Sequence, residues 1–310
     1  MVKSGNDSLV IAVLTYCRPD RIASVLPLLV RQCHSIPAPA TVLVIDNDPE
    51  ASAKLVVHGL ASEGVRYVHE PVPGIAAARS RALAEAGDAH LLVFIDDDEV
   101  PSDEWLLHLL KLYRRTSAAA VVGPVISEYA CVPDPWITAG EFFRRRRMPT
   151  GTPVTVAATN NLLLDLEQIR AMNLDFDRRF GLLGGEDTLF TRQIVERGGT
   201  MVWCDEAIVM DQVPEDRLTR EWVLRRAFSS GNSWSRVSLE LASGKPARRR
   251  QRVRLLASGG VRIAGGLAKS TAGILGMSVA RRAKGLRTMA RGAGMTSGAF
   301  GYAYREYHRP

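Results

Sequence analysis

Three consecutive aspartates, Asp96, Asp97 and Asp98, follow the apolar run of residues 91–95. Such a run predicts a buried strand of an α/β sheet, and open α/β sheets bind ligands at the carboxyl ends of their strands. Adjacent carboxylates repel one another, so stability alone gives little reason for this arrangement. Oxygen-only ligands suit Mg²⁺ or Mn²⁺, which bridges one or two carboxylates to substrate phosphates. The alternative is an acidic loop in which Asp98 caps a helix.

Polar residues also follow a second apolar run, residues 42–45. Asp46 and Asn47 come directly after it, so they are expected at the same edge of the sheet. There Asp46 can hold a base or a ribose through hydrogen bonds. The alternative is an Asx turn leading into Asp48-Pro49.

A glycine and an arginine form a third candidate feature. Gly74 precedes a predicted helix over residues 75–86, where the missing side chain lets an anion approach the helix N-terminus. Arg79 lies one turn into this helix and can reach a phosphate, although a solvated arginine fits the pattern equally well. Alone, this motif is weak evidence for an anion site, and its interpretation depends on the other motifs.

Gly184, Gly185, Glu186 and Asp187 form a fourth feature. Two glycines free the backbone, and two acids follow at the start of a predicted helix over residues 186–197. Acids at that place often only complement the helix dipole. The functional interpretation is a general base, held by the glycine turn close to a substrate hydroxyl.

Strand and helix patterns alternate over residues 9–126. Predicted strands cover 9–14, 42–45, 65–69, 91–95 and 120–126. Predicted helices begin at Arg18-Pro19-Asp20, after Gly74, and at Ser102-Asp103, which is expected to cap its helix. Pro27 should interrupt and kink the first helix. Such alternation predicts an α/β fold with a mainly parallel sheet and helices on both faces.

The following segment is less regular. Residues 128–153 contain several prolines and the run Arg144–Arg147, which predicts a mobile loop that orders over a ligand, with a solvated basic loop as the alternative. Beyond it, strands are expected over 154–164 and 201–204 and a helix over 219–230.

Charge is distributed unevenly over the 310 residues. Residues 244–310 carry 15 Lys/Arg and one acid, a net charge of +14, whereas the whole chain carries +7, so the preceding body is acidic. Clusters at 248–254 and at Lys284, Arg287 and Arg291 alternate with apolar residues. This pattern favours an anionic membrane surface. The alternative is a helix pair packed on the body, and nucleic acid is disfavoured.

The cysteines, the N-terminus and the apolar runs indicate the cellular location of the protein. The cysteines, Cys17, Cys33, Cys131 and Cys204, lack metal-type spacing and are expected to be reduced and mostly buried. The polar N-terminus lacks a signal-peptide pattern, and no apolar run is long enough for a membrane span. These features predict a cytoplasmic protein, with peripheral attachment to the inner face of the membrane through the basic tail.

The ordered motifs resemble those of family 2 glycosyltransferases of the GT-A fold, over residues 8–235. They are Thr15-Tyr16-x-Arg18-Pro19, Asp46-Asn47, Gly74-Ile75-Ala76-Ala77-Ala78-Arg79, Asp96–Asp98, Asn160-Asn161 and Gly185-Glu186-Asp187. The chain departs from the family in having Arg79-Ser80 where an arginine-asparagine pair is usual, and Asp211 where a late histidine binds the metal. The QxxRW signature of processive synthases is absent, which favours transfer of a single sugar.

The resemblance implies roles for individual residues. Nucleotide-sugar binding falls to Thr15, Tyr16, Arg18, Asp46, Asn47, Gly74, Arg79, Asp96 and Asp97. Metal binding falls to Asp98, Asp96 and Asp211. Asp187 would be the catalytic base, with Glu186 as an acceptor or structural contact, and Asn160, Asn161, Gly185 and Trp222 would lie on the acceptor side.

These implications combine into one expectation. A GT-A catalytic domain over residues 1–243, with a nucleotide-sugar half at 8–126 and an acceptor half at 127–243, precedes a basic helical extension at 244–310. The expected enzyme uses Mn²⁺ or Mg²⁺ and transfers one sugar, with inversion, from a nucleoside-diphosphate sugar, UDP being the favoured nucleotide. The acceptor is the hydroxyl of a polysaccharide, lipid-linked or secondary-metabolite acceptor. The alternatives are a nucleotidyltransferase and a non-catalytic nucleotide-sugar binding module.

Overall fold

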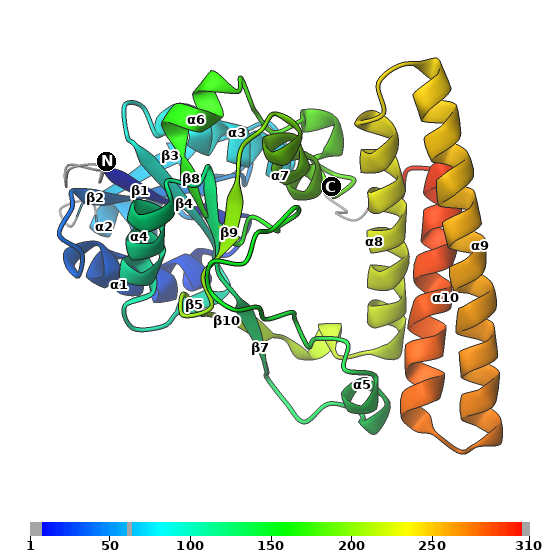
Figure 1. Ribbon diagram of the computed structural model, residues 1–310. Helices are drawn as coiled ribbons and strands as arrows, with labels where there is room; N and C mark the ends of the chain where they lie inside the picture. Colours follow the sequence, from blue (N-terminus) through cyan, green and yellow to red (C-terminus); the bar gives the residue numbers. More distant parts are fainter. Residues whose placement is uncertain (1–7, 61–63, 306–310) are drawn as a thin grey trace.

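The computed structural model describes residues 8–60 and 64–305, and Figure 1 shows a sheet-containing body beside a bundle of long helices. The predicted polar N-terminus, residues 1–7, lies outside the described residues, as do residues 306–310. A seven-stranded sheet forms the body, in the order β3-β2-β1-β4-β8-β6-β9. Its strands are β1 (Leu9–Thr15), β2 (Ala40–Asp46), β3 (Val65–His69), β4 (Leu91–Asp96), β6 (Ala120–Val122), β8 (Asn161–Asp165) and β9 (Met201–Trp203).

The sheet is mainly parallel, as predicted. β1 pairs in parallel with β2 and β4, whereas β8 runs antiparallel to both β4 and β6. The apolar runs become central strands because both faces of the sheet are covered, which requires near-continuous hydrophobic sequence. The parallel pairing brings the carboxyl ends of β1 and β4 side by side, so that Leu14 faces Asp96 in the register.

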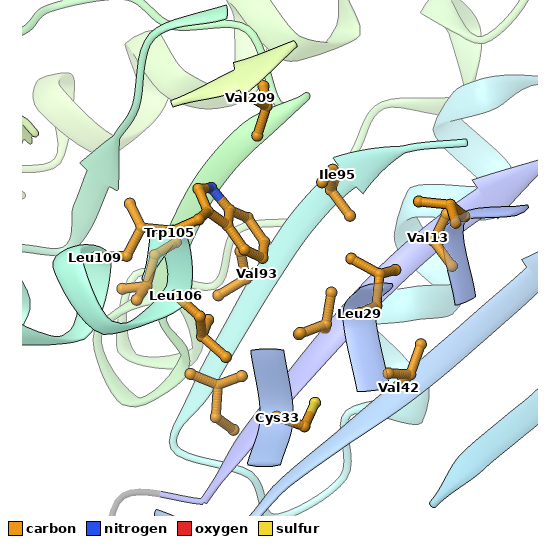
Figure 2. Close-up of a cluster of buried hydrophobic side chains, with 14 of the residues drawn as sticks. Val13, Leu29, Cys33, Val42, Val93, Ile95, Trp105, Leu106, Leu109 and Val209 are labelled. Carbon is orange, nitrogen blue, oxygen red and sulfur yellow. The ribbon is translucent and has the colours of Figure 1, made fainter. Parts of the chain in front are cut away.

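Helices cover both faces of the sheet. One face carries α1 (Pro19–His34), α2 (Lys54–Gly59) and α4 (Trp105–Thr116), and the other carries α3 (Ile75–Glu85), α6 (Leu166–Ala171) and α7 (Glu186–Glu196). Figure 2 shows part of the first layer, where Trp105 and Leu109 of α4 lie over Val93 and Ile95 of β4. Burying a large apolar side chain contributes about 1.5–3 kcal/mol, so these layers hold the strand ends that form the site.

Two predicted strand boundaries are wrong. The expected strand over 120–126 is two strands, because the chain turns at Gly123-Pro124 and β7 (Val125–Tyr129) leaves the main sheet. β7 joins β5 (Glu99–Pro101) and β10 (Val209–Val213) in a second sheet of order β5-β10-β7. The expected strand over 154–164 begins only at Asn161. The amide and carbonyl of Ala157 bond instead to the Thr191 hydroxyl of α7, which replaces ladder hydrogen bonds.

Two helix details also differ from the prediction. α1 continues through Pro27, whose side chain is on the exposed side, where water can satisfy the carbonyl that loses its partner. α4 begins after Glu104 in a left-handed conformation, without a side-chain cap. Ser102-Asp103 does not cap it, because the helix begins after Glu104; the Ser102 backbone amide and carbonyl bond to Ile208 and to the Gln32 side chain.

The segment predicted to be a loop over 128–153 contains the short helix α5 (Pro135–Gly140). Asp134 caps this helix by accepting a hydrogen bond from the amide of Trp136 at 2.6 Å. Three of the four arginines in the run 144–147 form ion pairs: Arg144 with Glu141, Arg145 with Asp211, and Arg147 with Asp205. The run is therefore tied to the body at several points, and its ordering over a ligand remains a prediction.

The basic extension is helical, as predicted, and packs on the body. α8 (Arg220–Glu240), α9 (Lys245–Leu275) and α10 (Val279–Ala299) form an up-down-up bundle, in which α10 contacts both other helices (Figure 1). Glycines allow these close contacts, because a Cβ added at Gly231 of α8 would overlap the carbonyl oxygen of Arg291 on α10. The described part of the extension, residues 244–305, is thus packed against α8 and α5, as the helix-pair alternative predicts, and the domain boundary at 243 remains a prediction.

Some cationic side chains of the extension contact other parts of the protein. Lys284 pairs with Glu141 at 2.5 Å, and the Arg287 guanidinium lies over the ring of Phe142. Two members of the second basic cluster thus contact the segment just after α5, whereas Arg291 of the same cluster is exposed. In the described part of the chain no helix has the length and apolarity of a membrane span.

The cysteine prediction is correct in part. All four cysteines are free thiols, but only Cys33 and Cys204 are buried, whereas Cys17 and Cys131 are exposed. Burial raises the pKa of the Cys33 thiol to about 12, so this thiol stays protonated and behaves as a small apolar side chain.

Glycine packing between α8 and α10 gives the first prediction. Gly231→Ala should destabilise the protein by about 1–3 kcal/mol, because its Cβ meets the backbone of α10. Gly265→Ala on α9 is the matched control, since nothing lies within 4 Å of its added Cβ. This control should be neutral or stabilising by about 0.5–1 kcal/mol. Denaturant unfolding of the full chain measures both changes, and equal effects would contradict the packing of α10 on α8.

Candidate active site

A cleft of about 790 Å³ opens at the carboxyl edge of β1 and β4. It is bordered by these strands and by α3, α7 and the first half of α8. Most of the sequence-predicted site residues line it: Thr15, Tyr16, Arg18, Asn47, Arg79, Asp96, Asp97, Asp98, Asn160, Glu186, Asp187, Asp211 and Trp222. Asp46, Gly74, Asn161 and Gly185 do not.

The aspartate triplet is surrounded by cationic and hydroxyl groups. Thr15 Oγ1 donates to Asp97 Oδ2 at 2.8 Å, and Arg18 Nη1 donates to Asp97 Oδ1 at 3.1 Å. Asp98 lies 3.4 Å from Arg18 and 3.7 Å from Arg217. These arginines lessen the repulsion that the sequence predicts, and Asp97 has the shorter of these contacts.

Asp96 has a different environment, formed with Glu99. The amide of Asp96 donates to Glu99 Oε2 at 3.1 Å, and Asn160 Nδ2 donates to Glu99 Oε1 at 2.6 Å. Burial, opposed by Arg79 and reinforced by Asp98, raises the pKa of Asp96 to about 6. Burial and the Asp96 charge likewise raise the pKa of Glu99 well above its usual range. The sequence analysis missed Glu99, although a fourth acid directly after three aspartates was an available signal.

A buried ion pair connects the two sides of the cleft. Arg79 of α3 donates through Nη1 to Oε1 of Glu186, the first residue of α7. Burial raises the pKa of Glu186 to about 7, although Arg79 opposes this shift. In the described part of the chain, Glu186 Oε2 is buried without a hydrogen-bond partner. Arg79 therefore binds an acid of the Gly184–Asp187 feature, and the solvated-arginine alternative is wrong.

Asp187 follows Glu186 and is partly exposed to the cleft. Its Oδ1 accepts hydrogen bonds from the amide of Thr188 at 2.5 Å and from the Thr188 hydroxyl at 3.2 Å. The carboxylate is thus oriented by its neighbour in the first turn of α7. A carboxylate held at the edge of a cleft can accept a proton from a bound hydroxyl.

Asp211 lies in the cleft wall but is already paired. Arg145, from the segment after α5, donates to Asp211 Oδ2, and Asp211 is buried on β10. The sequence assigned Asp211 to the metal, whereas here its carboxylate binds an arginine. Arg145 also contributes positive charge near Asp96 and Glu99.

Asp46 has a structural role. Its Oδ1 accepts from the amide of Asp48 at 3.1 Å, and its Oδ2 accepts from the Ala53 amide at 2.9 Å and the Tyr67 hydroxyl at 3.0 Å. The side chain is fully buried and does not reach the cleft. The Asx-turn alternative describes the hydrogen bonds of this residue, and its contact to a base or ribose stays a prediction.

Asn47 and Gly74 shape one wall of the cleft. Asn47 donates to the carbonyls of Glu70 and Val72 and accepts from the amide of Gly74 at 3.1 Å. Gly74 has a φ of 119°, and a Cβ there would lie 3.2 Å from the backbone of Gly181. Gly74 is thus required for a close chain crossing at the start of α3, and it does not face the cleft itself.

Two residues predicted on the acceptor side are also structural. Asn161 donates to the carbonyls of Pro124 and Ala207 and accepts from Trp105 Nε1 at 2.9 Å, so it is held where β6 and β7 separate. Gly185 has a φ of 94° and packs against Ser233 of α8. It sets the start of α7 and thereby places Glu186.

The far side of the cleft contains the predicted Trp222 together with residues that the sequence analysis did not single out. Trp222 of α8 stacks on Phe143, with ring centroids 5.7 Å apart. Arg225 and Arg226 follow one turn later, and Tyr304 from the segment after α10 completes this wall. Tyr304 is held by a bond from its amide to Asn232 at 3.1 Å. The sequence pattern could not predict Tyr304 in the site, because its position depends on how the helical bundle packs.

Asp96 and Asp98 fit a divalent cation better than Asp211 does. Both are carboxylates in the cleft, and the pKa of Asp96 is raised mainly by burial and further by the Asp98 charge, two effects that a cation would offset. In the described residues no group of three or more His, Cys, Asp and Glu side chains is arranged around a metal position. Two carboxylates suffice for an ion whose remaining ligands are substrate phosphates and water.

This fold and cleft define a GT-A glycosyltransferase architecture, and the comparisons with known proteins agree. The model of the family described as glycosyl transferase family 2 matches residues 10–164. The chain is 37% identical over 238 residues, 76% of each chain, to the succinoglycan biosynthesis protein ExoM of Rhizobium meliloti. The protein therefore belongs to glycosyltransferase family 2 and is a glycosyltransferase.

Solved structures share the fold at low sequence identity. Residues 1–349 of S. aureus TarS, in complex with UDP-GlcNAc, align with a TM-score of 0.53 and 14% identity over 89% of both chains. The Pyrobaculum calidifontis mannosyltransferase PcManGT, in complex with GDP-Man and Mn²⁺, aligns with a TM-score of 0.59 and 16% identity. This alignment covers 93% of the chain and 86% of PcManGT.

The raised pKa of Glu186 predicts how stability depends on pH. Its folded pKa of about 7 exceeds the ordinary value of 4.5, so the folded state binds more protons between these values. Stability should then fall as pH rises from about 4.5 to 7, by up to about 3 kcal/mol from this group. Glu186→Gln removes this titration and keeps an acceptor for Arg79. The decrease in Tm between pH 5 and pH 8 should therefore be shallower in this variant, and an unchanged pH profile would contradict the assignment.

Proposed function

We propose that this glycosyltransferase transfers one sugar, with inversion and with a divalent metal, from a nucleoside-diphosphate sugar to an acceptor hydroxyl. The observation that carries the proposal is one cleft with Asp96 and Asp98 on one side and Asp187 on the other, joined by the Arg79–Glu186 pair. The complexes of TarS with UDP-GlcNAc and of the mannosyltransferase with GDP-Man and Mn²⁺ support a nucleotide-sugar donor and a metal. UDP is the favoured nucleotide.

The residues divide the work between the two sides of the cleft. Mn²⁺ or Mg²⁺ held by Asp96 and Asp98 would supply positive charge to the diphosphate as it leaves. Arg18 and Arg217 already lie beside Asp98 and can turn toward phosphate oxygens, which bind guanidinium groups well. Asp187 takes the proton from the acceptor hydroxyl as its oxygen attacks the anomeric carbon. Glu186 keeps Arg79 at the centre of the cleft.

The acceptor side is aromatic and basic. Trp222, Phe143 and Tyr304 supply flat apolar surface, and Arg225 and Arg226 supply positive charge at its edge. Similarity to a succinoglycan biosynthesis protein supports an acceptor from polysaccharide assembly, either a free or a lipid-linked saccharide. Such an acceptor offers the hydroxyl that Asp187 needs.

The experiment that tests the proposal is product analysis with UDP-, GDP- and dTDP-sugars and Mn²⁺. A glycosyltransferase releases a nucleoside diphosphate, whereas a nucleotidyltransferase releases pyrophosphate. A thermal-shift panel of the same donors finds the one that binds, because a ligand at 100 times its Kd stabilises the protein by about 2.7 kcal/mol. Stabilisation with no turnover for any acceptor class would support the non-catalytic alternative.

The metal contact gives a prediction for Asp98. Asp98→Ala should abolish the increase in nucleoside-diphosphate affinity that Mn²⁺ produces, because one of two proposed oxygen ligands is lost. Asp103→Ala is the control, an exposed acid that does not line the cleft. Titration calorimetry with and without Mn²⁺ measures both variants. If metal-dependent affinity persists in Asp98→Ala, the cation is held elsewhere.

The proton acceptor gives a prediction for Asp187. Asp187→Asn keeps the shape of the side chain and should leave donor affinity near wild type, while kcat falls by roughly 10²–10⁴-fold. Steady-state kinetics and donor titration separate these two effects. Loss of turnover in Glu186→Gln with normal turnover in Asp187→Asn would transfer the role of base to Glu186.

A further inference from the structure

The turn between α9 and α10 carries four exposed apolar side chains, which we call the tip surface. Ile274, Leu275, Met277 and Val279 are 58%, 81%, 91% and 49% exposed. Proteins normally expose such residues singly, and a contiguous group indicates an interaction site. This group falls within six residues of sequence at the free end of a helical hairpin (Figure 1).

The exposed apolar surface continues along α9. At 3.6 residues per turn, Val253, Val261, Leu267 and Leu275 fall within a sector of roughly 120° of the helix. All four are more than half exposed, since α9 packs mainly on α10 and presents its opposite face outward. The two cations in the second half of α9, Arg262 and Lys269, lie outside this sector by the same geometry.

Positive charge surrounds this apolar face at both ends. Arg281 and Arg282 follow the tip surface and are exposed, and an exposed cluster over 248–254 lies at the start of α9. No acidic residue occurs between residues 244 and 305. A surface that is apolar along its length, cationic at its ends and free of acids complements a negatively charged apolar partner.

We propose that the tip surface and the outer face of α9 dock on an anionic lipid bilayer. Helices of this composition lie in the headgroup region with apolar side chains inserted and cations near lipid phosphates. A second copy of this chain fits less well, because pairing the same face would place cations opposite cations with no acid between them. Peripheral docking agrees with the described chain having no helix apolar enough to span a membrane.

The docking face lies at a defined place relative to the cleft. In an up-down-up bundle the end of α9 lies at the end where α8 begins, and α8 begins with Trp222 and Arg225 of the acceptor side. An acceptor anchored in the same bilayer would therefore reach this side of the cleft. That consequence rests on the proposed transfer reaction, whereas the docking itself does not.

Vesicle sedimentation with the full chain tests the proposal. The protein should bind phosphatidylcholine vesicles that contain phosphatidylglycerol, and binding should weaken with salt and be much lower on phosphatidylcholine alone. Leu275→Ser should lower the affinity about tenfold, because one inserted side chain is lost. Leu55→Ser on α2 is the matched control: Leu55 is 86% exposed on the sheet-containing body and should leave binding unchanged.

A charge pair of variants separates electrostatic from apolar docking. Arg281→Ser with Arg282→Ser should weaken binding at low salt by about fivefold per arginine. Lys111→Ser with Arg115→Ser, two exposed cations on α4, removes the same charge away from the tip and should have little effect. Equal losses in both pairs would mean that net charge, and not the tip surface, attracts the vesicles, and would overturn the proposal.

Two further results would overturn it. One is a wild-type chain that ignores anionic vesicles at low salt. The other is a chain that sediments as a dimer in the absence of lipid and becomes a monomer in Leu275→Ser, which would make the tip a self-association surface. Nucleoside-diphosphate binding is measured in parallel on every variant. It should stay at the wild-type level, so that a failure of lipid docking is distinguished from a failure of the proposed transfer.

Discussion

The buried ion pair between Arg79 and Glu186 is the contact on which the cleft depends. Arg79 belongs to α3 and Glu186 to α7, two helices on the same face of the sheet that are separated by about a hundred residues of sequence. Separating this pair would leave a buried charge without a partner, which typically costs about 3–5 kcal/mol. The pair therefore ties the start of α7, where Asp187 follows Glu186, to α3. Its local supports, Gly74 and Gly185, both adopt left-handed backbone conformations at the starts of these helices.

The sequence predicted the fold class and most residues of the cleft because strong local signals carried them. An apolar run followed by Asp96–Asp98 is a strand end in any α/β protein, and Gly185-Glu186-Asp187 is a helix start. The misplaced residues, Asp46 and Asn161, carry polar side chains at strand ends too, yet their hydrogen bonds turn inward. Local pattern cannot distinguish a polar side chain that faces the cleft from one that secures a chain crossing.

Residues that tertiary packing brings to the cleft could not be predicted, for the same reason. Arg145 binds Asp211 because β7 leaves the main sheet after Gly123 to pair with β10. The segment after α5 then lies beside β10. Glu99 accepts hydrogen bonds from the Asp96 amide and from the Asn160 side chain. Its position is set by β5, a strand of the second sheet. The basic extension shows the opposite error. Its net charge suggested a separate tail, whereas its glycines allow α9 to pack closely on α10, and Gly294 and Gly298 allow α10 to pack closely on α8.

Tyr304 makes one wall of the cleft depend on the segment that follows α10. It lines the cleft more than two hundred residues after the aspartate triplet, and it is placed there by the return of the chain past Asn232 after α10. During synthesis the sheet and its acids can assemble while the acceptor wall is still missing. Until α10 covers it, the glycine-containing face of α8 remains open to solvent. Cleavage before α10 would therefore open this wall of the cleft without removing any residue of its acidic centre.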